Sequence, residues 1–271
     1  MKKILVLFLL LSNFGHVAPC TLRQSDSLDR LLDHLHLYKL TKASFHAGNL
    51  LHHSLWSCRS LAQWFDEKGP WVEHLENYSS IIILGGLLHD IGKAGDHDFF
   101  YATKHTHPCD GFDYLWKQRP FRLEDGSIFN FKALYSELSI SRKEQRLLAI
   151  LVAMHWEFGL IMKNLHSDTN TSLERECQLY LDKLRNCCAQ TGFNKGIPTV
   201  KLLLSCIAVS AADVRGVQPN DYSNATLITL FGDTMAEGYN RPCYTGFDAY
   251  NNFKIEEEGL PIRKKLCDML K

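Results

Sequence analysis

Apolar side chains recur along most of the chain with the spacing of helices. The first stripe, at i, i+3, i+4 and i+7, consists of Leu28, Leu31, Leu32 and Leu35. It follows Ser25 and Ser27, which are candidate N-cap residues. Further helices are predicted over residues 49–66, 78–91, 143–164, 172–189 and 200–214. The last of these is almost wholly apolar, which is typical of a buried core helix. The pattern therefore predicts an all-α fold.

One segment departs from helical periodicity. Residues 121–131 alternate apolar and polar positions around the pair Asp125–Gly126. This combination predicts a small β-hairpin inserted in the helical body. Beyond Gly232 the chain is richer in Gly, Pro, Asn and Tyr. We therefore expect one core domain over residues 25–220 and a C-terminal extension, residues 221–271, packed on that core.

The N-terminus has the pattern of a secretory signal peptide. Lys2 and Lys3 precede an apolar run over residues 4–11 that is too short to span a bilayer. A polar stretch follows, with a candidate cleavage site after Cys20. We therefore expect residues 1–20 to be removed, the chain to be exported (secreted or periplasmic), and the mature chain to have no transmembrane helix. The alternative is a buried first helix or strand in a cytoplasmic protein.

Composition narrows the classes of partner. Hydrophobic residues make up 45% and charged residues 22% of the 271 residues, which is ordinary for a globular domain. Lys+Arg and Asp+Glu both number 30, so no bulk basic field would capture nucleic acid or a membrane surface. A small phosphorylated substrate remains compatible, because a local patch would serve it. The nine cysteines form no CxxC zinc pattern, and the sequence does not show whether they pair.

The segment that indicates chemistry is Leu87-Leu-His-Asp-Ile-Gly-Lys93. An apolar helix ends here in the adjacent pair His89–Asp90, so both side chains can approach one metal ion. Gly92 then releases the chain, and Lys93 projects nearby. A histidine nitrogen beside a carboxylate oxygen suits Mn, Fe, Mg, Zn or Ni rather than a thiolate site.

Four other segments offer the further ligands that a metal ion requires. The candidates are His53, His107, His155 and Asp213. Asp213 follows a run with no other charge, and burying such a group without a partner costs several kcal/mol, roughly 2–7 even for a neutral polar group. Alternatives remain open: His46 or His52 in place of His53, His105 in place of His107, a structural core role for His155, and pairing of Asp213 with Arg215.

The order His53, His89–Asp90, Asp213 resembles the HD-domain superfamily of metal-dependent phosphohydrolases over roughly residues 45–215. The segments HHSLW, GLLHDIGK and AADVRG are similar to its motif positions. His107, His155 and Lys93 resemble the additional residues of the two-metal branch that contains the HD-GYP phosphodiesterases. The Gly-Tyr-Pro signature of that branch is absent, because His155 is followed by Trp156-Glu-Phe-Gly159. The resemblance implies an HD-type helical bundle.

The resemblance also implies a mechanism. One divalent metal ion would be held by His53, His89, Asp90 and Asp213, and Asp90 would bridge to a second ion held by His107 and His155. The two ions would activate a water that hydrolyses a nucleotide or other small phosphate ester. Asp90, Lys93 and Arg215 are the expected catalytic residues, with Lys93 and Arg215 balancing charge on the phosphate oxygens. Substrate selectivity would come from the 121–131 hairpin and the C-terminal extension.

Two other functions fit the same residues. Some proteins with an HD-like fold, of the inositol oxygenase type, use four His and two Asp to hold a di-iron centre for oxygen chemistry. A catalytically degenerate, metal-binding regulatory module is the third reading. The sequence does not indicate the oligomeric state, the native metal or the pathway.

Overall fold

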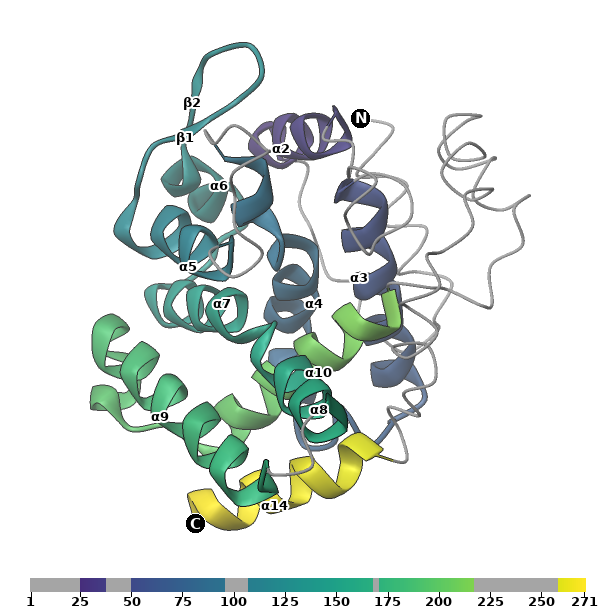
Figure 1. The fold of residues 1–271 in the computed structure, drawn as a ribbon. Helices are drawn as coiled ribbons and strands as arrows, with labels where there is room; N and C mark the ends of the chain where they lie inside the picture. Colours follow the sequence, from purple (N-terminus) through teal and green to yellow (C-terminus); the bar gives the residue numbers. More distant parts are fainter. Residues whose placement is uncertain (1–24, 38–49, 96–106, 168–170, 217–257) are drawn as a thin grey trace, which may run out of the picture.

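The computed structural model describes residues 25–37, 50–95, 107–167, 171–216 and 258–271. Helices account for 77% of these residues, and a two-stranded ribbon provides their strands, which confirms the predicted all-α class with a small hairpin (Figure 1). The predicted signal peptide, and the part of the extension before residue 258, lie outside the described residues.

The helices follow in this order along the chain. The α-helices are α2 (Asp26–Leu37), α3 (Leu50–Asp66), α4 (Ser79–Leu88), α5 (His107–Phe112), α6 (Phe131–Glu137), α7 (Arg142–Met154), α8 (Glu157–Ser167), α9 (Leu173–Thr191), α10 (Val200–Gly216) and α14 (Leu260–Leu270). Shorter turns are the 3₁₀ segments η1 (Glu76–Tyr78), η2 (Ile91–Ala94) and η4 (Phe193–Gly196), and the π turn η3 (Asp113–Lys117). The strands are β1 (Phe121–Arg122) and β2 (Ile128–Phe129).

Helix α4 lies at the centre of the core. Its residues from Ile81 to Leu88 are all buried, because α3 packs on one side and α7 and α10 pack on others (Figure 1). Two glycines permit this close packing. A Cβ atom on Gly85 would lie 2.8 Å from Leu151 Cδ1, and one on Gly86 would lie 2.6 Å from Leu61 Cδ1. A helix that is apolar all round is buried, and His89, which directly follows α4, is buried with it.

The predicted helix over residues 143–164 is in fact two helices. α7 ends at Met154 and α8 begins at Glu157, with His155 and Trp156 forming a turn between them. At the break, side chains form hydrogen bonds with backbone carbonyls. His155 Nδ1 lies 2.7 Å from Val152 O, and the Ser210 hydroxyl donates to His155 O. Hydrophobic periodicity does not reveal this interruption, because the apolar pattern continues through both helices.

The ribbon is shorter than its sequence pattern suggests. Phe121 pairs with Phe129 and Arg122 with Ile128 in antiparallel register. The connecting turn places Gly126 at φ 80°, a left-handed conformation that favours glycine. Phe121 also contacts Phe131 edge to face at 5.7 Å between ring centroids, which fixes the base of the ribbon on the helical body.

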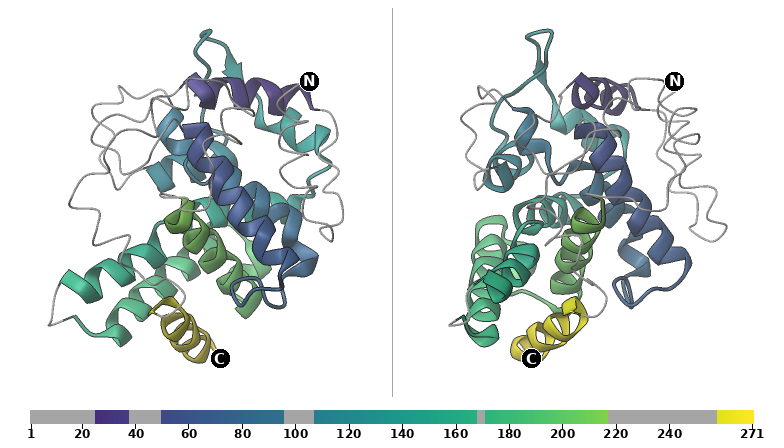
Figure 2. Two further views of the ribbon diagram at one scale, coloured as in Figure 1. Left: turned by 90° about the vertical axis from the view of Figure 1, so that its right-hand side faces the viewer. Right: turned by 45° about the vertical axis from the view of Figure 1, so that its right-hand side comes forward.

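The ribbon and α14 lie at opposite ends of the molecule in each view (Figures 1 and 2). α14 packs against α9 and α10, and its Ile262 and Leu266 are buried. This helix is the described end of the expected C-terminal extension.

One helical stretch, Arg142–Leu165, is long and apolar enough to cross a membrane by length and composition. It covers α7 and most of α8, and 72% of its most apolar window is buried inside the fold. Core helices of soluble proteins pass the same test, so the stretch is weak evidence for a membrane span.

The N-terminus of α7 is capped by its own sequence, which gives a test of the fold. Ser141 Oγ accepts from Glu144 N, while the Glu144 carboxylate accepts from Ser141 N at 2.7 Å, forming a capping box. Ser141→Ala should lower the free energy of unfolding by about 0.5–2 kcal/mol, measured by urea denaturation. Ser136→Ala, on an exposed site in α6, should change it by less than about 0.5 kcal/mol. Equal effects of the two changes would contradict the capping role.

Candidate metal centre

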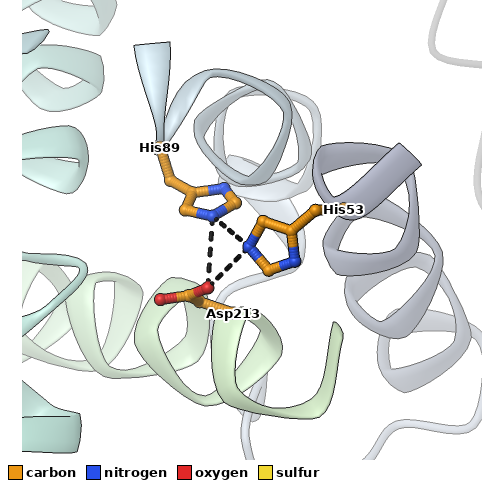
Figure 3. A group of neighbouring side chains, drawn as sticks. All are labelled: His53, His89 and Asp213. Carbon is orange, nitrogen blue, oxygen red and sulfur yellow. Dashed lines mark hydrogen bonds and ion pairs between the residues drawn. The ribbon is translucent and has the colours of Figure 1, made fainter. Parts of the chain in front are cut away.

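Three side chains from distant parts of the chain meet in the core. His53 comes from the start of α3, His89 follows α4, and Asp213 lies in the last turns of α10 (Figure 3). His53 Nε2 lies 2.9 Å from His89 Nε2 and 2.8 Å from Asp213 Oδ1. The third side of the triangle, His89 Nε2 to Asp213 Oδ1, is 3.2 Å. All three residues are buried, so this first group is a cluster of donor atoms within the protein interior.

A second group lies beside the first. His107, at the start of α5, and His155, after α7, approach the carboxylate of Asp90. Asp90 Oδ1 is 3.1 Å from His107 Nε2 and 3.4 Å from His155 Nε2, and the two histidine nitrogens are 3.1 Å apart. These residues are also buried.

The carboxylate of Asp90 faces both groups with different oxygens. Its Oδ1 belongs to the second group, while Oδ2 lies 3.6 Å from His53 Nε2 and 3.5 Å from His89 Nε2. The rings of His89 and His155 are 5.0 Å apart between centroids. The six residues therefore form one continuous centre in which Asp90 joins the two halves.

Two histidines are oriented by the same backbone device. His89 Nδ1 donates to Gly86 O at 2.7 Å, and His155 Nδ1 donates to Val152 O at 2.7 Å. In each case the acceptor is the carbonyl three residues earlier, near the end of the helix that precedes the histidine. The hydrogen on Nδ1 leaves the Nε2 lone pair of the neutral ring directed into the centre, which is the arrangement of a metal-ligating histidine.

Burial and neighbouring charges shift the pKa values of side chains in the centre. Burial disfavours the ionised forms of Asp90 and Asp213, yet their neighbours hold the pKa of both carboxyls well below the usual range. Lys93 and His89 have this effect on Asp90. His89 and His53 have it on Asp213. Burial also opposes a charge on His89, yet Asp90 and Asp213 raise its pKa. The carboxylates therefore remain ionised and attract positive charge.

The other two shifted histidines stay neutral. Burial lowers the pKa of His53, against the opposing effect of Asp213. Burial, followed by the charge of Lys93, lowers the pKa of His107 to about 4. At neutral pH these rings are unprotonated bases, which is the form that binds metals.

Lys93 lies at the edge of the centre with its ammonium against Asp90. Its Nζ is 2.5 Å from Asp90 Oδ2, and its side chain is 17% exposed. The other predicted basic residue, Arg215, belongs to α10 by its backbone, but its side chain lies outside the described residues.

The donor set fits divalent metal ions. Two ligands bonded to one ion at about 2.1 Å and at right angles are about 3.0 Å apart, and the short donor separations in both groups are 2.8–3.4 Å. Neutral histidine nitrogens at such distances would point lone pairs at one another without a positive charge between them. Imidazole and carboxylate donors suit Mn, Fe, Zn or Ni, so each group could hold a divalent ion.

Sequence reasoning found the six donors but not their supports. The structure brings together His53, His89, Asp90, His107, His155 and Asp213. The competing residues His46 and His105, and the side chain of His52, lie outside the described residues. The Gly86 and Val152 carbonyls, which orient the rings of His89 and His155, carried no recognisable sequence signal. The Ser210 hydroxyl donates to the backbone carbonyl of His155. Ser210 precedes Asp213 on the same face of α10 by three residues, a spacing that could have indicated a shared role.

The chain matches no family model, no curated protein and no solved structure in comparisons with known proteins.

Gly92 allows the second group to form. A Cβ atom on this residue would lie 1.9 Å from His107 O and 2.8 Å from Gly111 N, so η2 and α5 are in direct backbone contact. Gly92→Ala should push α5 away and lower the amount of Mn²⁺ bound per chain in equilibrium dialysis. It should also lower the free energy of unfolding by about 1–3 kcal/mol, as overpacking does.

Gly69→Ala is the matched control, because its Cβ would meet the Trp64 side chain at an ordinary 3.4 Å. This variant should bind metal as the unaltered chain does. Normal metal content in Gly92→Ala would mean that the contact between η2 and α5 does not position His107.

Proposed function

We propose that this protein is a metal-dependent phosphohydrolase of the HD type, acting on a nucleotide or another small phosphate ester. The observation that carries the proposal is the Asp90 carboxylate, whose two oxygens face two separate groups of buried side chains that could each hold a metal ion. A carboxylate shared between two ions is typical of sites that hold them a few ångströms apart for hydrolysis. The order of the six donors along an all-α chain supports the HD assignment.

The charge of the site favours a phosphate substrate. Two divalent ions would bring four positive charges, and Asp90 and Asp213 contribute two negative ones, leaving a net charge of +2 before Lys93 is counted. The four histidines add none while they are neutral ligands. A buried excess of positive charge attracts a dianionic phosphate ester and stabilises charge that develops on its oxygens.

Metal ions bound here would supply the Lewis acidity that generates a hydroxide-like nucleophile at neutral pH and neutralises phosphate charge. The protein residues supply position. His89 and His155 are held by the Gly86 and Val152 carbonyls, so their donor atoms are fixed before an ion binds. Lys93 orients the Asp90 carboxylate and places an ammonium beside it, where it can balance charge on a phosphate oxygen. Arg215 is proposed for the same task.

The deciding experiment combines metal analysis with a screen of phosphate esters. The purified chain should contain close to two divalent ions and hydrolyse a phosphomonoester, phosphodiester or nucleotide. A chelator should abolish the activity, and added Mn²⁺ should restore it. Two iron ions per chain with oxygen consumption and no ester hydrolysis would contradict the proposal and favour the oxygenase. Bound metal with neither activity would favour a regulatory module.

Asp90→Asn tests the shared carboxylate. The amide removes the negative charge and one of the two acceptor oxygens, so the side chain can no longer offer an oxygen to both groups. Hydrolysis measured at saturating Mn²⁺ should fall by more than about 100-fold, the upper end of the effect of residues that only support a ligand. Asp182→Asn, on the exposed surface of α9, should leave the rate unchanged. An active Asp90→Asn enzyme that still needs metal would disprove the assigned role.

Substitutions in the two groups should have different effects on metal content. His107 is a donor of the second group alone, so His107→Gln should lose one ion and retain the other. His53 belongs to the first group, which contains the additional carboxylate of Asp213, so His53→Gln should remove the more tightly held ion. Isothermal titration with Mn²⁺ should show one remaining tight site in His107→Gln and none in His53→Gln. Identical titrations of the two variants would exclude two distinct ion sites.

A further inference from the structure

His34 connects three elements next to the metal centre. It lies on α2 and is 3% exposed. Its Nε2 is 3.0 Å from Ala94 O, at the end of η2, and its Nδ1 is 3.1 Å from Glu124 N, in the loop of the β1–β2 ribbon. The ring also meets Phe121 edge to face at 5.3 Å between centroids. One buried side chain therefore touches α2, the ribbon and the turn that follows Asp90.

Two hydrogen-bond partners determine which nitrogen of this ring carries the hydrogen. The Glu124 backbone N–H can only donate, so His34 Nδ1 accepts. The Ala94 carbonyl can only accept, so His34 Nε2 carries the hydrogen and donates. The ring is consequently the neutral Nε2–H tautomer, and reversing it would lose both hydrogen bonds in a buried site. This pairing gives His34 a single orientation.

The contact to Ala94 lies one residue from the charged groups of the centre. η2 begins directly after Asp90 and ends at Ala94, with Lys93 between them. The turn is closed by Lys93 N donating to Asp90 O at 2.8 Å, and the Lys93 ammonium lies against the Asp90 carboxylate. In such a short turn, a displacement of the Ala94 carbonyl moves the Lys93 backbone with it.

Steric contacts restrict where η2 can lie, but they do not restrict its rotation, which His34 fixes. Gly92 lies against the His107 backbone, and a Cβ atom on Gly95 would lie 1.9 Å from Tyr114 Oη. These contacts prevent the turn from moving toward α5 and η3. They do not fix the direction in which the Ala94 carbonyl points. The hydrogen bond from His34 fixes this direction, because hydrogen bonds are directional.

We propose that His34 is a positioning residue of the metal centre. Its hydrogen bond to Ala94 fixes η2, and through η2 it fixes the Asp90 carboxylate and the Lys93 ammonium. His34 thereby sets the metal affinity of the second group, and its link to Glu124 couples the ribbon to that site. The catalytic meaning of this role rests on the proposed function, whereas the tether itself does not.

Two substitutions separate the two hydrogen bonds of His34. His34→Gln places an amide donor near the position of Nε2, so it can retain the bond to Ala94. His34→Asn places an amide oxygen near the position of Nδ1, so it can retain the bond to Glu124 but does not reach Ala94. His74→Asn is the control, because His74 is exposed and its positive φ of 66° suits asparagine.

Hydrogen exchange of the metal-free chain tests the tether. His34→Asn should speed exchange of the amides over residues 91–95 at least about tenfold, an opening cost of about 1.4 kcal/mol by the usual conversion. Exchange in α4 should not change. His34→Gln and His74→Asn should exchange as the unaltered chain does. Unchanged exchange in His34→Asn, or equal acceleration in the Gln and Asn variants, would overturn the proposal.

Mn²⁺ titration of the same variants tests the consequence. His34→Asn should weaken the second ion by about 10–100-fold and the first ion, which also has Asp213, by much less, and His34→Gln should restore most of the loss. A general loss of stability would instead weaken both ions equally and would overturn the positioning role. If His34→Asn does not fold, His34→Gln decides alone: normal exchange and affinity support the tether, and loss of either overturns it. Absence of metal binding in the unaltered chain would refute the proposed function, while exchange would still decide the tether.

Discussion

The structure depends on the meeting of two buried carboxylates with four imidazoles. Asp90 and Asp213 are 1% and 7% exposed, and ionised carboxylates in such surroundings cost several kcal/mol unless positive charge compensates them. Lys93 supplies one such charge at Asp90. The remaining negative charge must be matched by protons on histidines or by cations. The carboxylates raise the pKa of His89, which favours the first solution, and a divalent ion in place of that proton would be the second.

Helix ends provide a further reason why cations are favoured here. α4 and α7 both stop at the centre, and Asp213 lies in the last turns of α10. The C-terminal ends of helices carry partial negative charge from carbonyls that lack intrahelical partners. Two of these carbonyls, from Gly86 and Val152, accept hydrogen bonds from His89 and His155. The carbonyls at the end of each helix therefore also orient the histidine that follows it. The ends of α4 and α7 and the orientation of His89 and His155 therefore have the same structural cause.

Most of the candidate donors could be predicted from sequence because they are polar residues within or directly after an apolar run, whereas His107 lies in a polar stretch and was indicated only by the family resemblance. His89–Asp90 and Asp213 stand out in this way, and the apolar runs also place α4 and α10 in the core. The break between α7 and α8 could not be predicted, since it depends on His155 and on the hydroxyl of Ser210 from another helix. The role of Gly92 depends on the backbone of α5, which is distant in sequence. Periodicity reports which face of a helix is buried, but not which partner covers it.

The two halves of the centre are electrostatically unequal, and this bears on how metal ions would fill them. The first group has Asp213 to itself and shares Asp90, whereas the second has only the shared Asp90 and two histidines. The charge of Lys93 also helps to lower the pKa of His107, a member of the second group. A cation entering the second group would therefore meet less negative charge than one entering the first. On the proposed function, a second ion would depend more than the first on the positions of Asp90 and Lys93, so the support of their turn by α2 and the ribbon would bear on its binding.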